Sequence, residues 1–132
     1  MKNKLKICIT LMLAVVMMSS IVVMAATGDK STTIAAGEKR TLHTGLRGSK
    51  SSISFTALST SPALGDACSL YVYTVNNNSG KGDGSGVSIK RTSVTYSVPY
   101  ASTVPQSTVF ALKGRTNLPS PYSLKLSYRY SY

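Results

Sequence analysis

Few side chains in this sequence of 132 residues could carry out chemistry. The usual reactive groups amount to four acids, one histidine and two cysteines: Asp29, Glu38, Asp66, Asp83, His43, Cys8 and Cys68. A glycosidase needs two carboxylates with well-separated pKa values, and these acids are scattered over turn-like segments and the region after the apolar start. A hydrolase triad would have to use His43, but no G-x-S-x-G element accompanies it. We therefore expect no enzyme and no catalytic residue.

Metal and cofactor sites are equally poorly supplied with ligands. One histidine and one cysteine beyond the first 25 residues cannot complete a tetrahedral zinc site. The glycine- and asparagine-rich segment 76–86 faintly resembles a calcium loop, but Asp83 is its single acid, and calcium takes several oxygen ligands. We expect neither a metal nor a cofactor.

The first 25 residues have the three parts of an export signal. Lys2, Lys4 and Lys6 precede the apolar run 7–23, and the small residues around Ala25 suit a signal-peptide cleavage site. This pattern predicts a signal peptide at 1–25, cut after Ala25 or Ala26, and a single secreted or cell-surface domain over 26–132. The alternative is an uncleaved N-terminal membrane anchor, since about 20 residues can span a bilayer. No span is expected after the leader.

Positive charge is the main hint about a partner. The formal net charge of +11 falls to +8 when the three leader lysines are removed. Together with eight tyrosines, these cations could hold an anionic cell-wall polymer or a polysaccharide, by ionic contacts and by stacking on sugars. Nucleic acid is not an expected partner of an exported protein. The candidate binding residues are Lys39, Arg40, Arg47, Lys81, Lys90, Arg91 and Arg115.

Cys68 is the single cysteine of the predicted mature chain, so no internal disulfide can form. It precedes an apolar segment, where burial is the common outcome for cysteine. A free thiol and an intermolecular bridge are the alternatives, and the oligomeric state is left open.

Beyond residue 27 the apolar residues recur with the period of two that is typical of strands. Segment 122–132 alternates Tyr and Leu with Ser, Lys and Arg without exception, which predicts one long strand with a buried face and a wet face. Glycine and proline, including turn residues expected at Gly45 and Gly114, separate the segments. The expected strands are 32–35, 40–44, 51–58, 70–75, 87–89, 93–98, 108–112 and 122–132. Seven or eight short strands predict an all-β antiparallel sandwich, with a small closed barrel as the alternative.

Three local expectations follow. Segment 70–75 is apolar on both of the faces that alternate along a strand, which favours a central strand covered on both sides. Segment 76–86 carries no apolar residue, so we expect an unpacked mobile loop between two adjacent strands. If the last strand lies at a sheet edge, it could add a partner's strand, with Lys125 and Arg129 on its wet face; the alternative is that both of its edges are paired internally.

In overall design the chain resembles small secreted β-sandwich proteins of Gram-positive bacteria, including the lactococcin-972-like bacteriocins. The shared features are a lysine-rich leader, strands rich in Ser, Thr and Tyr, the Asn/Gly segment 76–86 and a tyrosine-rich last strand. The predicted signal peptide, the positive charge and the lack of a catalytic set lead us to expect an exported, non-catalytic binding or surface protein that contacts anionic or carbohydrate components of the cell envelope. The alternative is a secreted bacteriocin-like effector acting on a competitor's envelope.

Overall fold

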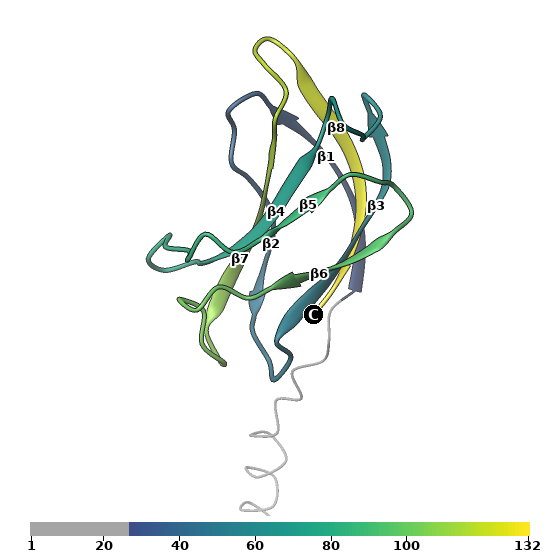
Figure 1. Cartoon of the computed structure of the whole chain (residues 1–132). Helices are drawn as coiled ribbons and strands as arrows, with labels where there is room; N and C mark the ends of the chain where they lie inside the picture. Colours follow the sequence, from purple (N-terminus) through teal and green to yellow (C-terminus); the bar gives the residue numbers. More distant parts are fainter. Residues whose placement is uncertain (1–26) are drawn as a thin grey trace, which may run out of the picture.

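The computed structural model describes residues 27–132, and these residues form eight strands without a helix (Figure 1). The predicted signal peptide, and its alternative as an anchor, lie outside these residues. None of the described residues belongs to a helix long and apolar enough to cross a bilayer. The strands are β1 (Thr27–Ala35), β2 (Arg40–Leu46), β3 (Ser52–Ser61), β4 (Leu70–Asn76), β5 (Val87–Ile89), β6 (Thr95–Pro99), β7 (Val109–Thr116) and β8 (Ser123–Ser131).

The strands form two four-stranded antiparallel sheets that face each other (Figure 1). The first sheet has the order β1-β8-β3-β6, and the second sheet has the order β2-β7-β4-β5. Every connection except β4–β5 passes from one sheet to the other. The outer strands of each sheet remain unpaired on one side, so the sheets do not close on themselves. The predicted antiparallel sandwich is confirmed, and the alternative of a closed barrel is wrong.

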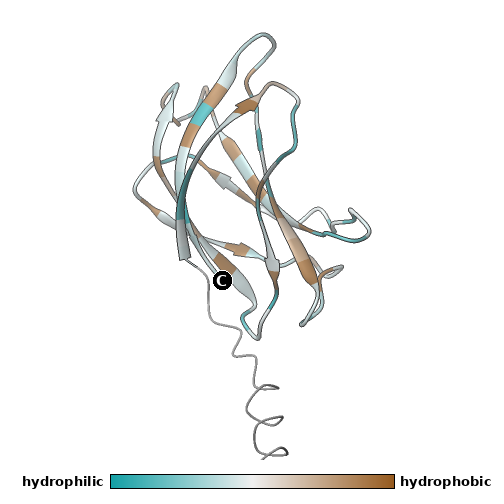
Figure 2. Ribbon diagram, turned by 180° about the vertical axis from the view of Figure 1, so that it is seen from behind, coloured by the Kyte–Doolittle hydropathy of each residue, from teal (hydrophilic) through white to brown (hydrophobic). Residues whose placement is uncertain are grey.

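Alternating side chains produce the core between the sheets. In β8 the inward residues Leu124, Leu126, Tyr128 and Tyr130 are buried, while the residues between them face solvent or are half-buried. Bands of alternating hydropathy along the strands are visible in Figure 2. Burying one large apolar side chain contributes about 1.5–3 kcal/mol, so this alternation determines which side of each strand faces inward.

Two strands continue through glycines that the sequence analysis placed in turns. Gly114 lies inside β7, where an added Cβ would come within 3.0 Å of Leu42 and 3.3 Å of Ile34. Gly45 lies inside β2, where the ring of Tyr132 occupies the space of a side chain. Each glycine makes room for core packing, so the expected separators at Gly45 and Gly114 were wrong.

The C-terminal strand differs from its prediction in two ways. Tyr122 was expected on the buried face, but it precedes β8 and is 64% exposed. In addition, β8 is paired on both sides, with β1 and with β3. Addition of a partner strand to β8 is therefore ruled out, and the alternative of internal pairing is confirmed.

Cys68 is buried, with 4% of its surface exposed, immediately before β4. It belongs to the apolar cluster between the sheets, as predicted. This position leaves its thiol out of reach of a partner chain in the folded domain.

Two buried tyrosines differ in what their hydroxyls contact. The hydroxyl of Tyr128 donates a hydrogen bond of 2.7 Å to the carbonyl of Leu42. The hydroxyl of Tyr100 is buried without a hydrogen-bond partner among the described residues. Burial raises the pKa of both tyrosines to about 12, so both hydroxyls stay protonated at neutral pH.

This difference predicts opposite outcomes for two matched substitutions. Tyr128→Phe leaves the Leu42 carbonyl unpaired and should lower the free energy of unfolding by about 1–2 kcal/mol. Tyr100→Phe removes a buried group that has no partner, so it should leave that free energy unchanged or raise it slightly. Urea unfolding of both variants checks the prediction, and an equal loss of stability in the two would contradict it.

Candidate functional site

The outer face of the second sheet brings two tyrosines and three cations together. Tyr71 and Tyr73 alternate with the buried residues of β4, so their side chains point away from the core. The register pairs Tyr71 with Arg115 and Tyr73 with Lys113 across β7. Lys39 directly precedes Arg40, which pairs with Gly114, so Lys39 lies beside Arg115. We call these five residues the tyrosine–cation face.

Contacts within this face hold its side chains in place. The guanidinium of Arg115 lies 4.7 Å from the centre of the Tyr71 ring, and the rings of Tyr71 and Tyr73 stack with their centres 5.7 Å apart. Burial raises the pKa of Tyr73, against an opposing effect of the Arg115 charge. Arg115 is exposed, whereas both tyrosines are half-buried. The face therefore presents a positioned cation rather than a freely moving one.

The glycine-rich connection between β4 and β5 forms one wall of this face. It joins two adjacent strands as predicted, but it packs against β4, contrary to the expectation of an unpacked loop. The hydroxyl of Tyr71 donates to the carbonyl of Gly84 at 2.9 Å. Gly86 lies so close to Tyr71 that an added Cβ would be 2.6 Å from its ring. Only glycine allows the loop to approach the ring this closely.

The carboxylate of Asp83 stabilises the same loop through hydrogen bonds. It accepts hydrogen bonds from the backbone N–H groups of Ser85 (2.9 Å) and Ser102 (2.7 Å) and from the Ser85 hydroxyl. These bonds lower the pKa of Asp83 strongly, with the Ser85 hydroxyl as the largest cause. Among residues 27–132, no group of three or more His, Cys, Asp or Glu side chains is placed to hold a metal ion.

Two hollows lie over the tyrosine–cation face and share Lys39, Tyr71 and Arg115. One, of about 360 Å³, extends over Tyr73 and Lys113 to the glycines of the loop. The other, of about 440 Å³, extends to Ser88 and Asn117. The two hollows adjoin at these three residues, and we call the two together the groove over β4 and β7.

The structure unites two of the seven predicted binding residues, Lys39 and Arg115. Arg40 forms an ion pair with Glu38 at 3.1 Å. The guanidinium of Arg47 lies 4.6 Å from the centre of the Tyr100 ring and donates to the carbonyl of Val104, so this side chain holds the 100–108 loop. The other three are exposed elsewhere: Lys81 in the β4–β5 loop, and Lys90 and Arg91 after β5.

Sequence reasoning missed Tyr71, Tyr73 and Lys113 as members of the site. Residues 70–75 were interpreted as covered on both sides, but only Val75 is buried on the outer side, where Gly82 packs against it. The two tyrosines could have been recognised because they are two residues apart, which places both on the same face of a strand. Lys113 and Arg115 are also two residues apart, but their shared face is evident only when β7 is known to continue through Gly114.

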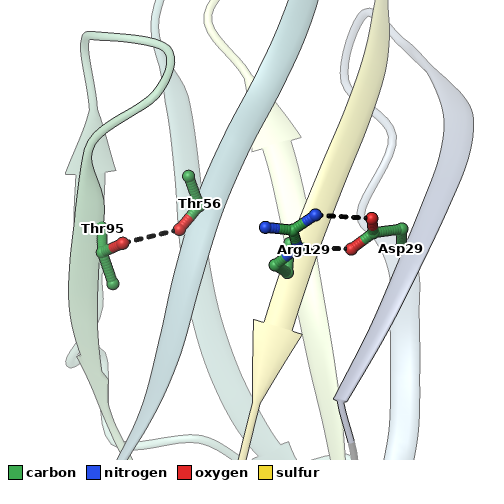
Figure 3. Close-up of polar contacts among 4 residues, drawn as sticks. All are labelled: Asp29, Thr56, Thr95 and Arg129. Atoms are coloured by element: carbon green, nitrogen blue, oxygen red, sulfur yellow. Dashed lines mark hydrogen bonds and ion pairs between the residues drawn. The ribbon is translucent and has the colours of Figure 1, made fainter.

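On the opposite outer face, on the first sheet, one row of charges is already paired, while Lys125 on the same face is exposed. One row across this sheet contains Asp29, Arg129, Thr56 and Thr95, as Figure 3 shows. Arg129 makes two hydrogen bonds to Asp29, of 2.6 and 2.8 Å, and Thr56 and Thr95 bond to each other at 2.8 Å. A ligand for this row would have to replace those contacts, so the second sheet offers the better anion site.

His43 lies at the open edge between β1 and β2, apart from the tyrosine–cation face. Its ring stacks on Tyr130 with centres 4.3 Å apart, its Nε2 is 3.2 Å from the Tyr132 hydroxyl, and its Nδ1 is 3.5 Å from Lys30 Nζ. Burial, and next the Lys30 charge, lower the pKa of His43. No carboxylate orients the ring among these contacts, so the cluster lacks the arrangement of a hydrolytic triad.

The chain matches no protein-family model, no curated protein and no solved structure. The resemblance to small secreted sandwich proteins therefore stays a prediction, and any functional argument depends on the geometry of the tyrosine–cation face.

The lowered pKa of His43 predicts acid sensitivity. The folded state disfavours the protonated ring, so the free energy of unfolding should be constant well above the usual histidine pKa of 6.5 and should fall as the pH drops through it. Urea unfolding between about pH 8 and pH 5.5 measures this trend. His43→Gln should remove the dependence in this range, and an unchanged slope in that variant would contradict the assignment.

Proposed function

We propose that this protein is an exported, non-catalytic binding protein that holds an anionic or carbohydrate polymer of the cell envelope on its tyrosine–cation face. The observation that carries the proposal is the positioned Arg115, stacked on Tyr71 at 4.7 Å beside Lys39 and Lys113. The leader-like start of the chain supports export, and the net charge supports an anionic partner.

The residue inventory supports binding rather than catalysis. The groove over β4 and β7 is lined by cations, tyrosine rings, glycines and hydroxyls, and the nearby carboxylate of Asp83 is occupied by Ser85 and Ser102. General acid–base chemistry requires a titratable side chain that can contact the substrate and whose pKa lies near the working pH. The described groove offers no histidine or free carboxylate for that role.

The proposal predicts that purified protein binds isolated cell walls of its own producing organism through this face. Lys113→Glu should weaken binding about tenfold, since it replaces a favourable charge contact with a repulsive one. The matched control is Lys125→Glu, which changes a lysine on the outer face of the first sheet and should have a much smaller effect. Co-sedimentation with the walls measures both.

Two results would overturn the proposal. One is the absence of binding to the walls, and the other is an equal loss of binding in both variants, because the second sheet would then have no special role. Circular dichroism spectra of the variants show that any loss does not come from unfolding.

A further inference from the structure

The ring of Tyr71 is not available as a platform for a sugar. It contacts the guanidinium of Arg115 at 4.7 Å and the ring of Tyr73 at 5.7 Å, and Gly86 lies directly against it. Its hydroxyl is bonded to Gly84. Neutral-sugar recognition by stacking needs an open ring face. Here the ring supports a cation instead, so the face is built around charge.

The charged groups of the groove favour an acidic ligand over a neutral glycan. Sugar hydroxyls both donate and accept hydrogen bonds, whereas Lys39, Lys113 and Arg115 can only donate. Asp83, in the loop that forms the wall of the groove, already accepts three hydrogen bonds, and Glu38, between Gly37 and Lys39, is paired with Arg40 at 3.1 Å. Within the described residues, the groove therefore offers an excess of cationic donors, which suits oxyanions.

The spacing of these cations follows from the sheet. Lys113 and Arg115 are two residues apart on β7, which places their backbones about 7 Å apart on the same face. Lys39 lies beside Arg115 on the neighbouring strand, at about 5 Å. The groove continues past them in both directions, from Val75 to Ser69 along β4, a length of about 20 Å at 3.4 Å per residue. A single small anion would contact only part of this length.

We infer that the ligand is a linear polyanion that carries an acidic group, phosphodiester or carboxylate, on each repeat and lies along the groove over β4 and β7. One oxyanion contacts Lys113, and the next contacts Arg115 and Lys39, which lie side by side. This inference rests on the proposed function and narrows it, since it excludes a neutral polysaccharide. Tyr71 and the loop through Gly84 and Gly86 position Arg115 and form the wall of the groove.

Binding of defined probes to the full-length protein tests the inference. The probes are long-chain inorganic polyphosphate, polygalacturonate, neutral dextran and orthophosphate, each titrated between about 50 and about 200 mM salt. Polyphosphate, polygalacturonate or both should bind, and the tighter of the two identifies the acidic group. The logarithm of the binding constant should decrease linearly with the logarithm of the salt concentration. The expected slope is about −2, because each of the three cations contributes about −0.7. Dextran should not bind, and orthophosphate should bind far more weakly than the polymers.

Matched variants locate the contacts. Lys113→Gln and Lys39→Gln should each reduce the salt slope by about 0.7, whereas the control Lys125→Gln should leave it unchanged. Arg115→Lys keeps the charge but loses the planar fork held on Tyr71, so the affinity should fall about threefold or more while the slope stays near the wild-type value.

The outcomes separate this inference from the proposed function. Salt-insensitive binding of dextran, or a salt slope that Lys113→Gln and Lys39→Gln both leave unchanged, overturns the polyanion inference while wall binding can still hold. If orthophosphate binds as tightly as the polymers, the inference that the ligand is a linear chain is overturned. Failure to bind walls overturns the proposed function itself, whatever the probes show.

Discussion

The exclusion of charge from the space between the two sheets is the constraint on which the other features depend. The buried inward positions of β3, β4, β7 and β8 carry apolar residues or tyrosines, with Thr74 as the one buried polar residue among those described. A charge placed there without a partner would cost several kcal/mol. The many cations of this chain must therefore lie on the outer faces, in the loops or at the sheet edges, and the pairing of strands decides which of them meet.

The two outer faces use their charges differently. On the first sheet, Arg129 is paired with Asp29 and neighbouring hydroxyls bond to one another, so the polar groups of that row satisfy each other. On the second sheet, Arg115 is supported by the ring of Tyr71 rather than by a carboxylate. A cation held by an aromatic ring keeps its charge available to a ligand, whereas a cation in an ion pair is largely neutralised. This contrast is the physical basis for assigning the site to the second sheet.

Glycines contribute to both the core and the site by allowing close approach. Gly114 lets Leu42 and Ile34 meet over β7, and Gly86 lets the β4–β5 loop lie against Tyr71. Because β7 continues through Gly114, Lys113 and Arg115 lie on one face of the strand, and the loop at Gly86 forms a wall of the groove. The effect of a glycine inside a strand can therefore be interpreted only together with its neighbours, because it depends on which atoms fill the space where a side chain would lie.

The alternation in residues 53–57 and 124–130 was enough to predict the fold class and the buried side of most strands. The scarcity of reactive groups can also be read directly from the residues. The pairing of distant strands was needed to show that β8 is internal, that Gly45 and Gly114 lie within strands, and that Arg47 holds a loop through Tyr100. The site likewise required it, since Lys39, Tyr71 and Arg115 come from three strand regions far apart in the chain. Alternation specifies a side chain's face, but its neighbours depend on strand order and register, which arise from contacts between distant segments.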